Sequence, residues 1–463
     1  MVDIHEQKEF SLLEETKDIV FVNNIDFDVV KEIEQILGAD LKDDITEPFT
    51  TVLTFGKLKA KRLHIVNFKD LKKDKKRKDI YKKIASLKGE ICILIDTFDN
   101  DDYHEIAQDL TESIFTLNYE INKFKSKDES KDKNFHYYGE TEIYDVVKKG
   151  YILGEAINEC RNLVNTPYNY LNATDLANYV QEFEKIENVT VEIFNKEQIE
   201  EMNMGAFLGV NKGSIDEPKL ILVKYQGKES WENPTALVGK GVMYDTGGYS
   251  LKTPASMPGM KVDMAGAAAV ISAIQAIAKL GLKENVMSIV AATDNRIGDG
   301  AIVPDDILTA ANGKTIEVIS TDAEGRLTLA DAVWFAQQQG AKRVIDVATL
   351  TGAMVMALGE QYTGLFTNDK KFYKEFKKAA KRTKEPIWRM PINKGYHDEL
   401  KSEVADMKNK GSRLAGASQA AAFIENFIED DTKWIHLDVA GTASNKKGGT
   451  GVMVKTFTEL FEK

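Results

Sequence analysis

The sequence predicts an α/β protein made of two domains, and three observations support this prediction. Short apolar runs rich in β-branched residues alternate with helical patterns along most of the chain. The 463 residues are 43% hydrophobic and 29% charged, which is typical of a globular protein with a large core. A charged stretch without apolar residues, 126–134, separates a shorter N-terminal part from a longer C-terminal part.

Residues 1–140 are predicted to form a smaller N-terminal α/β domain. Its strands are expected at 18–24, 51–55, 62–68 and 90–98, and its helices at 28–37 and 105–124. Residues 141–165 are expected to form a linker helix, because apolar residues recur at helical spacing from Glu142 to Leu163. This helix should end before Pro167, since proline disfavours helical backbone in the residue before it.

Residues 166–463 are predicted to form a larger domain with a mixed central sheet flanked by helices. Its strands are expected at 219–227, 235–241, 286–295, 315–321 and 343–350. Helices are expected at 266–281 and 329–340, and each closes with a glycine. Strands with near-continuous apolar runs are typical of a sheet covered by helices on both faces.

Composition and charge exclude several classes of protein. A formal net charge of -12 argues against nucleic acid as a general partner. The N-terminus lacks a basic segment followed by an apolar run, and no uninterrupted apolar stretch reaches the length of a membrane helix. The two cysteines, Cys92 and Cys160, do not form a CxxC pattern. We therefore expect a cytoplasmic protein without a membrane partner.

Charged side chains gather in the loops that follow the predicted strands of the larger domain. The set comprises Lys240, Asp245, Lys252, Asp263, Asp322, Glu324 and Arg326. Clustered carboxylates repel one another unless protons or cations neutralise them, and divalent metal ions accept such oxygen ligands. Composition alone leaves another interpretation open, in which Asp322 and Glu324 are solvated loop residues and Asp263 is a plain helix N-cap.

The amino-acid sequences of these segments resemble those of the leucyl aminopeptidase family of two-metal cytosolic exopeptidases. The family signature is Asn-Thr-Asp-Ala-Glu-Gly-Arg-Leu, and residues 320–327 here are STDAEGRL, with Ser320 in place of the asparagine. The segments VGKGVMYDTGGYSLK (238–252) and KVDMAGAAAV (261–270) also match the family. The resemblance covers about 160–463, whereas residues 1–140 resemble the family only in forming a smaller preceding domain.

The resemblance implies two divalent metal ions per subunit, manganese or zinc. The ligands of the tighter ion would be Lys240, Asp245, Asp263 and Glu324, and those of the more exchangeable ion would be Asp245, Asp322 and Glu324. Lys240 would bind as a neutral amine, because nearby cations lower the pKa of a lysine. Lys252 would contact the substrate carbonyl, and Arg326 would hold a bicarbonate or a water cluster that acts as general base.

The same resemblance implies a substrate, a pocket and an assembly. The protein would release N-terminal Leu or other apolar residues from short peptides, as a homohexamer. The pocket for the first side chain would contain Met260, Thr349, Leu350 and Gly352. Ordinary core packing is the alternative interpretation of Met260 and Leu350.

A basic run, KDLKKDKKRKD at 69–79, keeps a second class of function open. Such a run is usually a solvated helix face, and this one lacks interleaved aromatic residues for base stacking. It is also compatible with a DNA-binding regulator built on an aminopeptidase scaffold.

Overall fold

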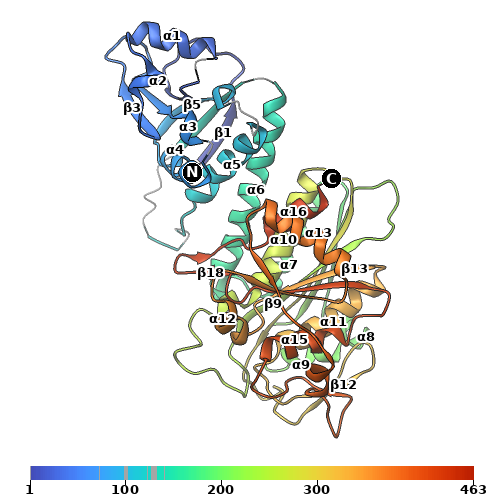
Figure 1. Ribbon diagram of the computed structural model, residues 1–463. Helices are drawn as coiled ribbons and strands as arrows, with labels where there is room; N and C mark the ends of the chain where they lie inside the picture. Colours follow the sequence, from blue (N-terminus) through green and yellow to red (C-terminus); the bar gives the residue numbers. More distant parts are fainter. Residues whose placement is uncertain are drawn as a thin grey trace. The chain divides into compact units, whose positions relative to one another are not determined.

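The computed structural model describes residues 2–24, 26–71, 73–98, 103–121, 124–126, 133–139 and 141–462. The chain divides into two compact units, Met1–Asn158 and Glu159–Lys463. Each unit contains a sheet with helices packed against it, so the predicted α/β fold class is confirmed (Figure 1).

The first unit is built on a six-stranded sheet. In spatial order its strands are β1 (Val2–Glu6), β6 (Lys133–Tyr138), β5 (Gly89–Leu94), β2 (Asp18–Val22), β4 (Arg62–Val66) and β3 (Phe49–Leu53). All neighbours are parallel except β3 and β4. The helices are α1 (Asp28–Leu37), α2 (Leu41–Asp44), α3 (Phe68–Leu71), α4 (Asp74–Ala85) and α5 (Tyr103–Leu117).

Several boundaries in this unit differ from those expected. Strands β1 and β6 were not predicted, and Lys133 and Asn134 belong to β6 instead of the expected loop 126–134. Residues 127–132 of that loop lie outside the described residues. Strand β6 buries residues on one face only and pairs with β1 and β5, which are distant in sequence, so its local pattern is weak.

Helix α6 (Thr141–Asn165) spans the predicted linker, and the boundary between the two units falls inside it. Its role as a linker between independent domains, 1–140 and 166–463, stays a prediction. The basic run 69–79 lies in and around α3 and α4, where Lys73 and Lys76 both pair with Asp70. The DNA-binding alternative is not tested by these contacts.

The second unit is built on an eight-stranded mixed sheet. In spatial order the strands are β15 (Ile387–Arg389), β14 (Thr363–Thr367), β17 (Lys433–Asp438), β13 (Arg343–Ala348), β9 (Thr235–Asp245), β10 (Asn285–Asn295), β8 (Lys219–Gln226) and β7 (Val189–Phe194). The four central strands, β17, β13, β9 and β10, are parallel to one another. Their carboxyl ends therefore meet at one edge of the sheet.

Helices cover both faces of this sheet, as the sequence predicts (Figure 1). One face carries α10 (Ala265–Lys279), α13 (Lys370–Arg382) and α16 (Val454–Phe461). The other face carries α9 (Gly205–Asn211), α11 (Gly325–Gln338) and α15 (Gly416–Glu425). The remaining helices of the unit are α7 (Ala173–Gln181), α8 (Lys196–Glu201), α12 (Gly352–Leu358) and α14 (Lys394–Asp398). Because both faces are covered, every residue of β10 is buried.

The expected strand 315–321 is shorter than predicted. Only β12 (Thr315–Glu317) is extended, and it belongs to a separate small sheet with β11 (Ile307–Thr309) and β16 (Met407–Lys408). The two-stranded sheet of β18 (Ser444–Asn445) and β19 (Gly448–Gly449) completes the unit. The stretch 260–279 is long and apolar enough for a membrane helix, but 78% of its most apolar window is buried inside this unit.

Asp331 of α11 ties the first turn of α9 and the loop after β11 to the core of the second unit. Its carboxylate accepts the backbone N–H of Phe207 at 2.8 Å and that of Ala311 at 2.8 Å. We predict that Asp331→Ala lowers the free energy of unfolding by about 1–3 kcal/mol, because buried donors lose their acceptor. Urea denaturation measures this difference. Exposed Asp299→Ala serves as control, and equal midpoints for the two variants would contradict the prediction.

Candidate active site

A cavity of about 660 Å³ lies at the carboxyl ends of the central parallel strands. Every site residue that the sequence predicts lines it, namely Lys240, Asp245, Lys252, Met260, Asp263, Asp322, Glu324, Arg326, Thr349, Leu350 and Gly352. These residues come from β9 and the loop after it, from the 3-10 turn Met260–Met264, from the start of α11 and the turn before it, and from the loop between β13 and α12 with the first residue of α12. The parallel arrangement of the strands explains why segments more than 100 residues apart meet here.

Lys240 lies in the middle of β9 and is 3% exposed. Its Nζ atom is 2.8 Å from Asp263 Oδ1, 2.8 Å from Glu324 Oε1 and 3.1 Å from the carbonyl oxygen of Thr349. Burial alone would lower the pKa of this lysine, but the two carboxylates outweigh burial and raise the pKa above its ordinary value. In this structure Lys240 is therefore an ammonium that partly neutralises a buried acidic cluster.

Asp263 is not the helix N-cap that composition alone allowed. It lies in a 3-10 turn, Met260–Met264, and the N-cap of α10 is Met264, without a side-chain capping hydrogen bond. The Asp263 carboxylate instead accepts from Lys240 and, at 3.0 Å, from the Thr349 hydroxyl. Asp263 therefore lies just before α10 as part of the cavity wall and not as a cap of the helix.

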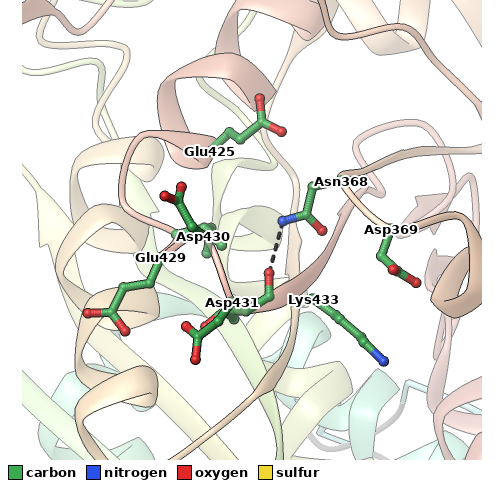
Figure 2. Close-up of a pocket in the computed structure, with 9 residues that line it drawn as sticks. Asn368, Asp369, Glu425, Glu429, Asp430, Asp431 and Lys433 are labelled. Atoms are coloured by element: carbon green, nitrogen blue, oxygen red, sulfur yellow. Dashed lines mark hydrogen bonds between the residues drawn. The ribbon is translucent and has the colours of Figure 1, made fainter.

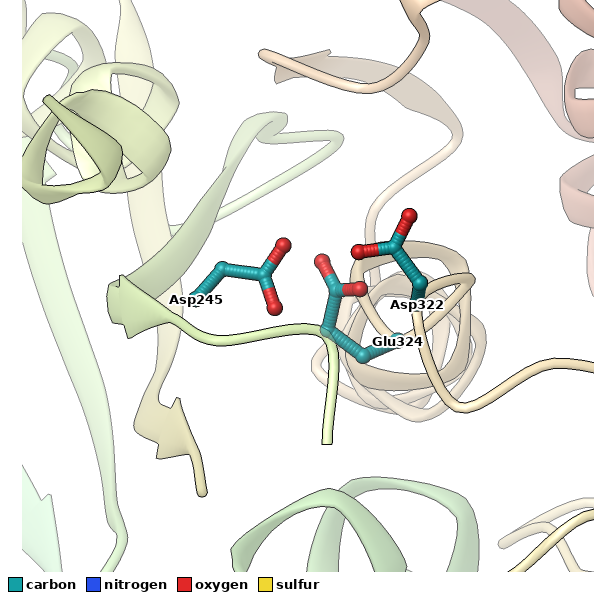
Figure 3. Close-up of side chains that lie close together, drawn as sticks. All are labelled: Asp245, Asp322 and Glu324. Atoms are coloured by element: carbon teal, nitrogen blue, oxygen red, sulfur yellow. The ribbon is translucent and has the colours of Figure 1, made fainter. Parts of the chain in front are cut away.

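The carboxylates of Asp245, Asp322 and Glu324 point toward a common centre (Figure 3). Oxygen atoms from the three groups lie within 4.8 Å of one another. Lys252 Nζ bridges two of them, at 2.7 Å from Asp245 Oδ2 and 2.5 Å from Asp322 Oδ1. Burial and the charge of Glu324 raise the pKa of Asp245 to about 6, although Lys252 acts in the opposite direction.

Asp322 and Glu324 converge because of a turn and not because they alternate along a strand. Residues 321–322 form a turn, and Glu324 has helical backbone angles immediately before α11. Gly325 then allows the helix start to approach Lys240, since a Cβ atom there would lie 2.4 Å from Lys240 Cε. Gly247, at φ +84°, allows the loop after β9 to pass close to Asp322.

Asn295 at the end of β10 is a site residue that the sequence reasoning did not identify. Its Nδ2 donates to Asp245 Oδ1 at 2.8 Å and to the carbonyl oxygen of Thr321 at 2.9 Å. It thus links the end of β9 to the turn that carries Asp322. The only signal in the sequence is its place at the end of a predicted strand, which does not reveal its partners.

Arg326 lies in the first turn of α11 and is 7% exposed. Its Nη1 donates to the carbonyl oxygen of Asn409 at 2.9 Å, whereas Nε is buried without a partner among the described residues. Burial lowers the pKa of this guanidinium to about 10, against the nearby carboxylates of Glu324, Asp438 and Asp322. The Nε–H group of Arg326 is therefore available at the cavity wall as a hydrogen-bond donor to a ligand.

The loop after β13 forms another wall of the cavity. Asp438, at the end of β17, accepts the backbone N–H of Leu350 at 3.2 Å and the hydroxyl of Thr351 at 2.7 Å. Leu350 both lines the cavity and packs against the hydrophobic core, so the two interpretations of this residue stay open. Met260 and Gly352 line the cavity without belonging to that core.

The donor set fits divalent metal ions. Asp263 Oδ2 and Glu324 Oε2 are buried and have no hydrogen-bond partner among the described residues. A buried charged oxygen without a partner is costly, and a cation is the natural compensation. Together with Asp245 and Asp322 they supply the hard oxygen ligands that such ions accept.

A second cavity, of about 470 Å³, is also acidic but is built differently (Figure 2). Its carboxylates point in different directions, and three of them already have partners. Asp431 pairs with Lys342, Glu425 contacts His397, and Asp369 caps α13. None of the predicted site residues lines this cavity.

Comparison with known proteins identifies the family of the chain. Residues 158–458 match the model of the cytosol aminopeptidase family, catalytic domain. The chain belongs to the cytosol aminopeptidase family. It is 43% identical over 392 residues to a probable cytosol aminopeptidase of Bacillus subtilis, covering 81% of this chain and 78% of that one. A probable cytosol aminopeptidase of Bacillus licheniformis is 41% identical, covering 81% and 79%.

A solved structure extends the likeness over the whole chain. A mutant of tomato leucine aminopeptidase matches with a TM-score of 0.81 and 29% identity, covering 99% of this chain and 96% of that one. The protein is therefore an aminopeptidase of the cytosol aminopeptidase family, and the cavity at the strand ends is its candidate active site.

Asn295 offers a test of how this aminopeptidase holds its carboxylates. We predict that Asn295→Ala lowers metal affinity or kcat/KM by about 10- to 100-fold, as is usual when a partner of a ligand is removed. Asn285→Ala is the matched control, because Asn285 is also buried and donates two hydrogen bonds, but at the other end of β10. Titration with Mn²⁺ and steady-state kinetics measure both variants, and equal losses would contradict the prediction.

Proposed function

We propose that this chain is a two-metal aminopeptidase that releases N-terminal residues, preferably Leu or other apolar residues, from short peptides. The observation that carries this proposal is the convergence of Lys240 with four carboxylates, two of which have a buried oxygen that no other described residue contacts by a hydrogen bond. The tighter ion would be held by Lys240, Asp245, Asp263 and Glu324, and its positive charge would lower the pKa of Lys240 so that this lysine binds as a neutral amine. The more exchangeable ion would be held by Asp245, Asp322 and Glu324.

A bound pair of divalent ions supplies hydroxide near neutral pH and positive charge beside the scissile carbonyl. The role of Lys252 is to donate to the carbonyl oxygen as negative charge develops on it. Its ammonium is already held in the cavity by Asp245 and Asp322, and the charges of Asp245 and Glu324 raise its pKa despite burial. Arg326, whose Nε has no hydrogen-bond partner in the described part of the chain, would hold a bicarbonate or a water cluster that transfers protons.

Selectivity would come from the shape and polarity of the cavity. Met260 and Leu350 offer apolar surface to the first side chain, and Thr349 and Gly352 leave room beside them. The free amine of the substrate would lie at the metal site, which restricts cleavage to the first peptide bond. Manganese and zinc are both compatible with these ligands. A cytoplasmic homohexamer is the proposed form of the protein, by resemblance to its family.

Metal removal and a substrate panel test the proposed function. We expect a chelator to abolish hydrolysis of Leu-amide and Mn²⁺, Zn²⁺ or Co²⁺ to restore it. We also expect Leu- and Met-amides to be cleaved about tenfold or more faster, by kcat/KM, than charged aminoacyl amides, because an apolar pocket discriminates on this scale. Full activity after exhaustive chelation, with metal content confirmed to be low, would contradict the proposal.

Lys252→Ala separates catalysis from metal binding. We predict that kcat falls by about 10²- to 10³-fold, the usual effect of losing one donor to the developing oxyanion, while metal content stays near normal. Glu324→Ala should instead lower metal content together with activity. Elemental analysis and kinetics on the same samples measure both quantities. A Lys252→Ala enzyme with unaltered kcat would disprove the assigned role.

A further inference from the structure

Two cations at the active-site cavity are not explained by the proposed metal site. Lys410 and Arg413 line the same cavity as the carboxylates and are exposed. Within the described part of the chain neither forms an ion pair. Lys240 and Lys252, by contrast, are each held by two carboxylates. Lys410 and Arg413 are therefore available to a ligand.

The loop that carries these cations is anchored on both sides. Before it, the fully buried Asn409 accepts the Ile319 backbone N–H at 2.8 Å, and its carbonyl oxygen accepts from Arg326. After it, Gln419 of α15 donates to the Leu414 carbonyl oxygen at 2.7 Å and is 2% exposed. Asn409 thus positions both Arg326 and the start of the backbone that presents Lys410 and Arg413.

Lys410 and Arg413 form a positively charged rim of the cavity, and this rim favours an anionic group of a ligand. Bound divalent ions would compensate the four carboxylates of the metal site, so positive charge at the rim would remain without a protein counterion. An ammonium and a guanidinium are both suited to a carboxylate, and the planar fork of the guanidinium can bind both carboxylate oxygens. A short peptide has one such group at its C-terminus.

We propose that Lys410 and Arg413 form a subsite for the C-terminal carboxylate of di- and tripeptides whose amino end lies at the metal site. This inference rests on the proposed function. Each additional residue moves the carboxylate as much as about 3.6 Å farther from the scissile bond, so longer chains lose the contact. The subsite would make short free-acid peptides better substrates than long or amidated ones. An acidic side chain after the scissile bond offers the same carboxylate chemistry from another source.

Matched substrates test this subsite. The measured quantity is the ratio of kcat/KM for Leu-Gly to that for Leu-Gly-amide, which differ in the C-terminal charge. We expect the ratio to exceed one in the natural protein and to fall about 3- to 10-fold in the double variant Lys410→Met/Arg413→Met, given the modest strength of exposed ion pairs. The change should lie mainly in KM. Lys410→Arg/Arg413→Lys should retain the ratio.

Control variants and control substrates distinguish a failure of the proposed subsite from a failure of the proposed function. Lys433→Met removes one positive charge at the opposite end of β17 and should leave the ratio unchanged. An unchanged ratio in the double variant would overturn the subsite, while cleavage of Leu-amide by the natural protein would still support the proposed function. No cleavage of Leu-amide by metal-loaded protein would overturn the proposed function itself. If only Leu-Asp-amide responds to the double variant, the subsite binds acidic side chains and the C-terminal proposal is wrong.

Discussion

Lys240 lies inside the protein between the carboxylates of Asp263 and Glu324, and this buried contact constrains the rest of the site. Removing charges from water costs several kcal/mol per ion unless partners compensate them. A single ammonium leaves one oxygen on each of the two carboxylates without a partner among the described residues. The interior is therefore arranged for more positive charge than the chain itself supplies, which is what a site for cations requires.

The parallel sheet provides the geometry for this cluster. Strand β9 places Lys240 at the cavity wall and ends at Asp245. The helix that begins at Gly325 approaches Lys240 so closely that this glycine position has no room for a side chain. The same edge of the sheet positions Arg326, whose contact with Asn409 orders the loop bearing the rim cations. In the proposed function the acidic groups at the base of the cavity hold metal ions, and Lys410 and Arg413 at its rim remain available to the C-terminal carboxylate of a short peptide.

The sequence predicted those features that depend on local pattern. The apolar runs of β9, β10 and β13 predict buried strands. The family resemblance of the segments around Asp245, Asp263 and Asp322 predicted a set of residues that all line one cavity. Features set by long-range contacts were missed. Strand β6 exists through its pairing with β1 and β5, and Asn295 matters because the fold brings Thr321 to it. The local sequence around Asp263 is compatible with a helix cap, and only the fold brings its carboxylate to Lys240.

The central claim is that these side chains together hold a pair of divalent cations. A crystal structure of the protein loaded with Mn²⁺, with anomalous scattering recorded at the manganese edge, tests it most directly. We expect two anomalous peaks about 3.5–4 Å apart, the usual spacing of a paired hydrolytic site, with Asp245 and Glu324 shared between them. Retention of the lysine–carboxylate contacts under saturating Mn²⁺, with no anomalous peak among these residues, would contradict the account.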